Sequence, residues 1–353
     1  MFVSHAGLDE VVPGGFGVTV FFFLSGYLIT TLLRQEYELT RTISLSRFYL
    51  RRAYRIIPPL YIVLLLLLMP IGNSHGNADV SHGAIVAQFL QFTNYYVLIW
   101  GSKHLIPDSL PTWSLAVEEH FYLLFPLLLY ALLRATSYGR IALVLGALCL
   151  TTLLWRCWLV YGLHVDFNYT YLASDSRIDS ILFGCVMGVW LNPALDGQLT
   201  GVTSARWLLV IAASIALLLF SFLYRSEGFR ETLRYSVQGV ALLPLFFTAI
   251  RKSTWPIYRW LQARPARFLG LISYTFYLIH LRALEVVSKY VGGSRLLVGI
   301  LGFAVAVAFA SAMYYLVERH LALVRRRLHS LLPAGKCAPI SLSSATAKAS
   351  MES

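Results

Sequence analysis

Two adjacent carboxyl groups, Glu118 and Glu119, lie in an otherwise apolar stretch of the chain. They belong to segment 111–122, which reads Pro-Thr-Trp-Ser-Leu-Ala-Val-Glu-Glu-His-Phe-Tyr. On a helix, Glu118 shares a face with Ser114 and Tyr122, whereas Glu119 lies about 100° further round. Carboxyl groups inside a membrane either support proton transfer or balance the charge of buried arginines. The sequence leaves both roles open for this pair.

Four arginines, Arg47, Arg51, Arg52 and Arg55, precede another apolar stretch. On a helix, Arg51 and Arg52 both lie within about one turn of Arg55, so their guanidinium groups point in similar directions. Planar guanidinium groups bind phosphate in a bidentate way. A basic cluster also anchors the cytoplasmic end of a span. We expect this cluster to bind phosphate, because an anchor does not require so many arginines.

A histidine near the start of the chain, His5, is a candidate general base. Imidazole is the side chain best suited to take a proton from a hydroxyl near neutral pH. The alternative is an ordinary solvated loop histidine. The glycines at 14–17 and the pair Ser25 and Gly26 follow it, and we expect them to serve close helix packing.

Further polar residues occur in later apolar stretches. Ser273, Tyr277 and His280 fall on one helical face, which predicts a polar stripe along a cavity. Glu318 could support the site or pair with nearby arginines. The remaining candidates for a supporting role are Arg177 and Asp179, and the arginines inside apolar stretches are Arg156, Arg177 and Arg282.

The composition is that of an integral membrane protein: 58% of the 353 residues are hydrophobic and 13% are charged. A span needs roughly 20 mostly apolar residues. Nine stretches qualify, at 16–33, 54–71, 112–133, 141–161, 174–191, 205–224, 234–250, 269–289 and 296–317. We predict an all-α, polytopic transmembrane bundle of nine full spans plus a truncated first span. The four cysteines lie in spans or in the tail and predict neither a disulfide framework nor a metal site.

The distribution of basic residues predicts the orientation. If segment 34–55 is cytoplasmic, 20 of the 29 Lys and Arg residues fall on the cytoplasmic side, as the positive-inside rule requires. The net charge of +12 then reflects topology and attraction to membrane lipids, so we expect no nucleic-acid partner. A multi-pass protein of the cell (inner, cytoplasmic) membrane is predicted.

Two segments fall outside this pattern. The stretch 85–100 is predicted to form an interfacial or re-entrant helix, because another span there would reverse the charge distribution. Residues 333–353, rich in Ser and Ala, are predicted to form a disordered cytoplasmic tail after a membrane domain at 1–332.

Four motifs together resemble the membrane acyltransferase 3 family, whose members O-acylate surface polysaccharides and other exported acceptors. They occur in the family's order at 14–30, 47–58, 113–123 and 272–280. The resemblance implies a core of ten spans and a cytoplasmic acyl-CoA as donor co-substrate, with no permanently bound cofactor. The acyl group, expected to be acetyl, would pass to a hydroxyl of an exported carbohydrate or lipid-linked glycan.

The resemblance also implies roles for residues. Arg52 and Arg55 match the family's Arg-x-x-Arg motif, which is expected near the CoA phosphates, with Arg47 and Arg51 beside it. His5 matches a histidine that is expected to be essential, as general base or as transient acyl carrier. The acids that match the family's pattern are Glu118, Glu119 and Glu318.

The chain departs from the family at its start. Family members carry a longer first helix with a Leu-Asp-Gly-Leu-Arg type motif, whereas only four residues precede His5, so a truncated first span is expected. The alternatives are an inactive truncated homologue and a small-molecule transporter or flippase. A transporter more often shows inverted repeats, which this sequence lacks.

Overall fold

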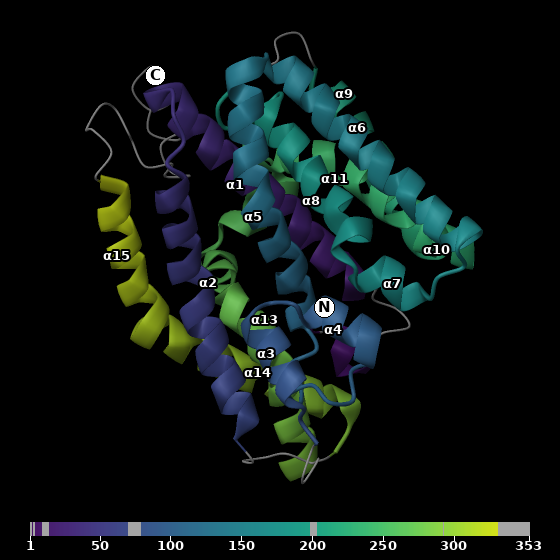
Figure 1. Cartoon of the computed structure of the whole chain (residues 1–353), viewed down its shortest axis with the longest axis vertical. Helices are drawn as coiled ribbons and strands as arrows, with labels where there is room; N and C mark the ends of the chain where they lie inside the picture. The colour runs from purple at the N-terminus through teal and green to yellow at the C-terminus, as the bar shows by residue number, and fades with distance from the viewer. Residues whose placement is uncertain are drawn as a thin grey trace.

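The chain folds into a bundle of α-helices (Figure 1). The computed structural model describes residue 2 and residues 4–8, 14–69, 79–197, 203–291 and 293–330, and these ranges contain no strand. The longer helices are α1 (Gly14–Thr40), α2 (Leu45–Leu68), α5 (Thr112–Ala135), α6 (Tyr138–Cys157), α8 (Ser174–Val189), α9 (Ser204–Leu223), α11 (Leu233–Arg251), α13 (Arg264–Tyr290), α14 (Arg295–Met313) and α15 (Arg319–Ser330). The shorter ones are α3 (His82–Phe89), α4 (Thr93–Trp100), α7 (Phe167–Leu172), α10 (Glu227–Glu231) and α12 (Pro256–Arg259), with π-helical turns at Ser4–Leu8, Trp158–Gly162 and Tyr314–Glu318 and a 3₁₀ turn at Trp260–Gln262. The predicted all-α fold is confirmed.

Six helical segments in the described ranges are long and apolar enough to cross a membrane. They are Gly14–Thr40, Thr112–Ala135, Tyr138–Gly162, Ser204–Leu223, Leu233–Arg251 and Arg295–Val324. Each coincides with one of the nine predicted spans. The other three predictions fall on α2, α8 and α13: α8 has only 16 residues, and the other two carry several charged side chains. A multi-pass membrane protein is therefore supported, and the exact number of spans stays a prediction.

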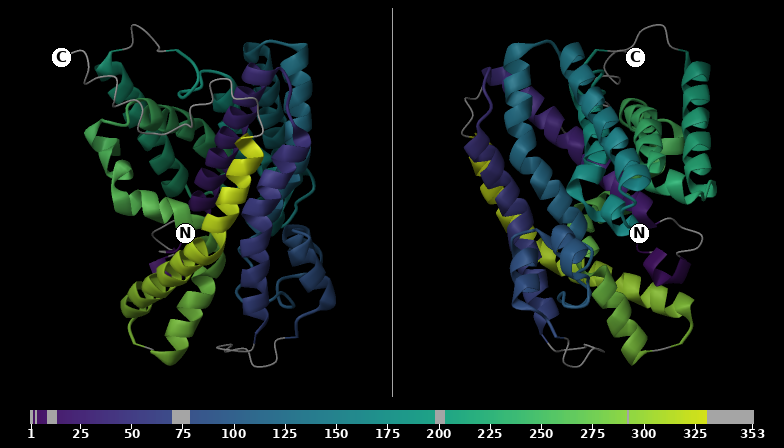
Figure 2. Two further views of the ribbon diagram at one scale, coloured as in Figure 1. Left: turned by 90° about the vertical axis from the view of Figure 1, so that its left-hand side faces the viewer. Right: turned by 45° about the vertical axis from the view of Figure 1, so that its right-hand side comes forward.

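The basic connections lie together at one end of the bundle. The turn between α1 and α2 and the turn between α5 and α6 are at the top of Figure 1, whereas the turn between α13 and α14 is at the opposite end. Helix α15 returns beside α2 (Figure 2). This arrangement is what the predicted orientation requires. The predicted tail, 333–353, lies outside the described residues.

The stretch 85–100 does not form a span. It folds as the two short helices α3 and α4, broken at residues 90–92. The fully buried Gln88 donates a hydrogen bond to Ser109 at 2.8 Å, and the fully buried Asn94 donates one to Ser174 at 3.0 Å. Buried amides need such partners. The prediction that no span forms here is confirmed.

Helices α1 and α8 pack closely through glycines. A Cβ atom added to Gly26 would lie 2.0 Å from the carbonyl oxygen of Ile181, and one added to Gly184 would lie 1.9 Å from that of Phe23. Small residues at these positions allow the two backbones to approach. The packing role predicted for Gly26 is confirmed, and it fixes the helix that carries Ser25.

A buried ion pair ties α6 to α8. The Arg156 guanidinium donates to both carboxylate oxygens of Asp179, at 2.8 and 2.6 Å, and neither side chain is exposed. It also donates to Ser236 on α11 at 2.7 Å and to the Thr232 carbonyl oxygen at 3.0 Å. The network joins α6, α8 and α11. Because these partners satisfy the buried Arg156 guanidinium, its charge is compensated within the bundle.

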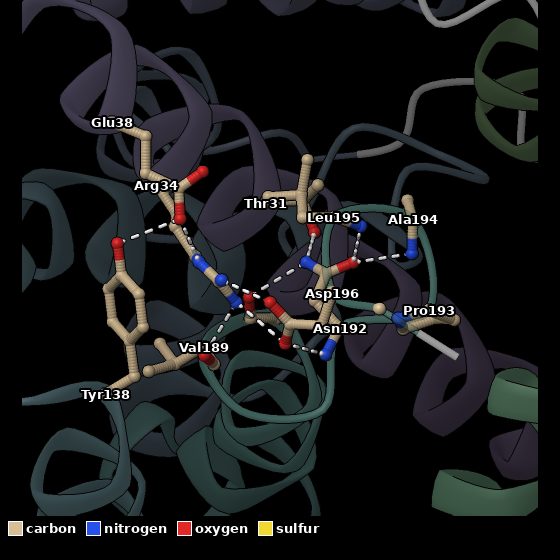
Figure 3. Close-up of polar contacts among 12 residues, drawn as sticks. Thr31, Arg34, Glu38, Tyr138, Val189, Asn192, Pro193, Ala194, Leu195 and Asp196 are labelled. Atoms are coloured by element: carbon tan, nitrogen blue, oxygen red, sulfur yellow. Dashed lines mark hydrogen bonds and ion pairs between the residues drawn. The ribbon is translucent and has the colours of Figure 1, made fainter. Parts of the chain in front are cut away.

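A second network holds the connection after α8 against α1 (Figure 3). Arg34 donates to Glu38 at 2.8 Å, to the Val189 carbonyl oxygen at 2.8 Å and to the carboxylate of Asp196. Burial alone would raise the pKa of Asp196, but the hydrogen bonds and charge of Arg34 hold it below its usual value. Arg34, one of the basic residues counted in the predicted orientation, therefore holds the segment after α8 against α1.

Candidate functional site

A cavity of about 210 Å³ lies between α1, α5 and α13. It is mostly apolar, with a few hydroxyl groups and one imidazole, the composition expected of a ligand site. Since pockets for drug-sized ligands measure about 300–1,000 Å³, the cavity has room for small groups rather than a whole cofactor. It is lined by Phe2, Gly17, Val18, Phe21, Ser114, Ser273, Tyr274, Phe276, Tyr277 and His280.

The polar stripe predicted on α13 is confirmed, because Ser273, Tyr277 and His280 all line this cavity. The Tyr277 hydroxyl lies 2.7 Å from Ser114 Oγ and donates to the Pro111 carbonyl oxygen at 2.8 Å. These bonds hold α13 against the start of α5. The helix of the paired acids is therefore fixed relative to the helix of His280.

His5 lies beside His280. It comes from the π-helical turn Ser4–Leu8, and the two ring centroids are 5.3 Å apart. His5 is exposed, whereas His280 is 1% exposed. The ring of Phe2, 5.5 Å from Phe303 and 5.6 Å from Phe276, packs this segment onto α13 and α14. The structure thus places two imidazoles at one end of the cavity.

Glu118 is held in a hydrogen-bonded chain between α5 and α1. It is 4% exposed and accepts a hydrogen bond from the Tyr122 hydroxyl, which lies 2.5 Å from Ser25 Oγ. The shared face predicted for Glu118 and Tyr122 is therefore confirmed. Glu119 is half-buried, and its Oε1 has no hydrogen-bond partner among the described residues.

The three arginines inside apolar stretches, which could form ion pairs with Glu118 and Glu119, have other partners. Arg156 pairs with Asp179, and Arg282 lies 2.6 Å from Glu285 and 3.2 Å from Asp108. Arg177 sits with its guanidinium carbon 3.7 Å from the centre of the Tyr235 ring. These three arginines therefore do not balance the charge of Glu118 and Glu119, and the two roles left open by the sequence stay predictions.

The basic cluster divides into paired and unpaired arginines. Arg51 lies 3.3 Å from Glu36 in an ion pair. Neither Arg52 nor Arg55 forms an ion pair within the part of the chain that the structure describes, and the same holds for Arg47 at the start of α2. The Arg52 guanidinium carbon lies 5.0 Å from the centre of the Tyr122 ring. Arg52 is thus next to the chain that holds Glu118.

Tyr274 connects the acids to the cavity, and sequence reasoning gave it no role. Its ring lines the cavity, its hydroxyl donates to the Ile56 carbonyl oxygen on α2 at 3.0 Å, and it lies within electrostatic range of Glu118 and Glu119. Its neighbour Thr275 donates to Glu318 at 2.5 Å. The only sequence signal was its place beside the polar stripe.

Two further candidates do not line the cavity. Asp179 is committed to Arg156, and Arg177 is fully buried with a hydrogen bond to Thr19 at 3.3 Å. The Nε and Nη1 atoms of Arg177 have no hydrogen-bond partner among the described residues. A supporting role for either residue stays a prediction.

The loop before α5 contains an acid that the sequence did not single out. Burial, together with the hydrogen bond and negative charge of Glu285, raises the pKa of Asp108 to about 7, although Arg282 opposes the rise. A carboxyl group in an unfolded chain titrates near pH 4. Its contribution to folding stability is therefore full below about pH 4 and is lost as the pH rises through about 7.

Replacing Asp108 with Asn should make the protein less sensitive to pH. Between pH 5 and pH 8 we expect the melting temperature in detergent to fall less for Asp108→Asn than for the wild type, an effect of at most about 1 kcal/mol for a partly exposed group. Asp79→Asn, at a mostly exposed side chain, is the control. An equal fall in wild type and Asp108→Asn would contradict the assignment.

Comparisons with known proteins identify acyltransferases as relatives of this chain. A family model described as an acyltransferase domain matches residues 2–315. The peptidoglycan O-acetyltransferase OatA of Listeria monocytogenes is 28% identical over 289 residues, which cover 78% of this chain and 46% of the relative. A putative O-acetyltransferase of Staphylococcus aureus is 28% identical over 338 residues, covering 90% and 54%. The O-acetyltransferase OatA of that species is 27% identical over 295 residues, covering 82% and 49%.

The chain spans about half the length of the curated relatives it matches. No solved structure matches it.

Proposed function

We propose, on the premise that this chain belongs to the acyltransferase domain family, that it is a membrane O-acyltransferase. The acyl group, acetyl in this proposal, comes from cytoplasmic acyl-CoA and passes to a hydroxyl of an exported or surface carbohydrate. The names of the relatives, O-acetyltransferases and in one case a peptidoglycan O-acetyltransferase, support the reaction and the kind of acceptor. The observation that carries the proposal is that the buried Glu118 forms no ion pair with Arg156, Arg177 or Arg282 and accepts a hydrogen bond from Tyr122, whose ring centre lies 5.0 Å from the Arg52 guanidinium carbon.

The donor would dock at the basic end of the bundle. Arg52 and Arg55 form no ion pair within the described ranges, and guanidinium groups bind phosphate well. Arg47 lies near the same end, and Arg51 would contribute only by exchanging its contact with Glu36. The small cavity then holds the acetyl thioester and the reacting hydroxyl, while the nucleotide stays outside it.

In the proposed reaction the acceptor oxygen attacks the thioester carbon while His5 takes the hydroxyl proton. The carbon–sulfur bond then breaks, and His5 returns the proton to the CoA thiolate. Glu118 and Glu119 stabilise the positive charge that develops on the imidazole, acting across the site. The products are the acetyl ester and free CoA, so atoms and charges balance.

Replacing Arg52 with Ala tests donor binding. We expect KM for acetyl-CoA to rise about 10- to 100-fold with a smaller change in kcat, because a hydrogen bond to a charged group contributes about 1.5–3 kcal/mol. The assay follows labelled acetyl transfer to a glycan acceptor by the full chain in liposomes. Arg140→Ala removes one exposed charge from the first turn of α6 and serves as the control.

An unchanged KM in Arg52→Ala would contradict donor binding at this cluster. Wild-type protein that binds no acyl-CoA but moves a labelled solute across the liposome membrane would instead support a transporter.

A further inference from the structure

His280 is a buried histidine whose hydrogen-bonding state is set by its own helix. Its Nδ1 lies 2.5 Å from the carbonyl oxygen of Tyr277. A carbonyl oxygen can only accept, so Nδ1 carries the hydrogen, and in the neutral ring Nε2 carries the lone pair. The ring is thus fixed in one tautomer.

The Nε2 atom of His280 has no hydrogen-bond partner among the described residues, although it is buried. Buried polar atoms almost always have a partner, so an exception needs an explanation. His280 lines the cavity, so a group that enters the cavity can reach its ring.

The position of His5 suits it to donate to this atom. In the structure the two rings are tilted by 46° and His280 Nε2 is not bonded to His5. A ring nitrogen lies about 1.2 Å from the centre of an imidazole, so at a centroid separation of 5.3 Å a turn of the exposed His5 ring brings its nitrogen within about 3 Å of Nε2, the length of a hydrogen bond. A neutral His5 that receives the acceptor proton on one nitrogen becomes a donor at both. Its second N–H can then point to His280.

We infer that His280 accepts a hydrogen bond at Nε2 from protonated His5 and thereby stabilises the imidazolium that forms when the acceptor hydroxyl is deprotonated. This inference rests on the proposed function and adds a positioning residue to it. His280 neither gains nor loses a proton: the proton moves from hydroxyl to His5 and then to the thiolate. The arrangement gives His5 the orienting partner that a base needs in nucleophilic catalysis.

The fixed geometry makes the bond specific to the charged state. The Tyr277 backbone orients His280, and the Tyr277 hydroxyl is held by Pro111 and Ser114. Because the acceptor is in place before the reaction, stabilisation of the developing charge requires no rearrangement of α13. Interactions that strengthen only as charge develops raise kcat rather than substrate affinity.

The test compares two substitutions of His280 in the full chain in liposomes, with acetyl-CoA and a glycan acceptor. His280→Phe keeps a ring but cannot accept, and we expect kcat to fall about 10- to 100-fold with little change in either KM. His280→Gln offers an amide oxygen and should recover part of that loss. His82→Phe makes the same exchange at an exposed histidine on α3 and is the control.

A double-mutant cycle separates this role from a structural one. In a His5→Ala background, His280→Phe should cause no further loss, since the bond partner is already absent. Wild-type kcat in His280→Phe, or equal losses in the Phe and Gln variants at unchanged melting temperature, would overturn the inference alone. If the wild-type chain transfers no acetyl group, the proposed function is wrong and the inference falls with it.

Discussion

Replacing His5 with Ala is expected to lower the rate of acetyl transfer by about a thousandfold, within the range that general acid–base catalysis contributes. The variant loses the imidazole that takes the acceptor proton, whereas the arginines near the proposed donor site are untouched. Binding of acetyl-CoA, measured by titration calorimetry on the purified full chain, should therefore stay within about twofold of the wild type. Loss of rate without loss of donor binding is the expected signature.

The control for this prediction is His82→Ala, because His82 is exposed on α3 and lies outside the cavity lining. Retention of wild-type rate by His5→Ala would show that another group takes the proton. A variant that loses both rate and donor binding would instead indicate that the segment Ser4–Leu8 supports the structure of the site.

Replacing Asp179 with Ala is expected to destabilise the protein by about 3–5 kcal/mol. The substitution leaves the Arg156 charge buried without its carboxylate, in a position where neither side chain is exposed. Most of the loss arises from the stranded charge rather than from the pair itself. Unfolding in detergent, followed by melting temperature or denaturant midpoint, measures it.

A double substitution provides the control for the buried pair. Arg156→Met combined with Asp179→Leu removes both charges and keeps most of the volume, and we expect it to recover much of the lost stability. If Asp179→Ala melts like the wild type, the two side chains do not form a buried ion pair. If the double variant is no more stable than Asp179→Ala, the loss is one of packing.

The parts of the site that lie within one helix were predictable from the sequence. The faces shared by Glu118 with Tyr122, and by Tyr277 with His280, follow from helical periodicity alone. The absence of a span at 85–100 followed from the charge distribution, whereas the division of this stretch into two short helices was not predicted. These features depend on local geometry, which the order of residues determines.

The features that depend on long-range packing were not predictable. Nothing in the order of residues places Glu36 beside Arg51, or Asp108 beside Arg282. These contacts determine which of the arginines form ion pairs in the described structure. The same limit applies to Tyr274, whose position between α2 and the cavity arises only when the helices assemble.

The predicted number of spans exceeded the six segments that meet the criteria of length and apolarity. We predicted a span on α13 from its apolar residues, although it also carries charged ones. In the described structure, two of these charged residues, Arg282 and Glu285, form an ion pair with each other, and Arg282 also pairs with Asp108. Charged side chains that are paired inside a bundle lower the mean hydropathy of a helix, but they do not place an unpaired charge in the lipid. Spans at α2, α8 and α13 therefore stay predictions.

The glycine contacts between α1 and α8 limit how the cavity can be enlarged. Any side chain at Gly26 or Gly184 would collide with the facing backbone, so the wall formed by α1 cannot be moved back without separating the two helices. In the proposed function, room for a longer acyl chain comes from shortening side chains that line the cavity, such as Phe21 on α1 or Phe276 and Tyr274 on α13. On that proposal, selection between acetyl and larger donors is tuned by these aromatic side chains and not by the position of α1.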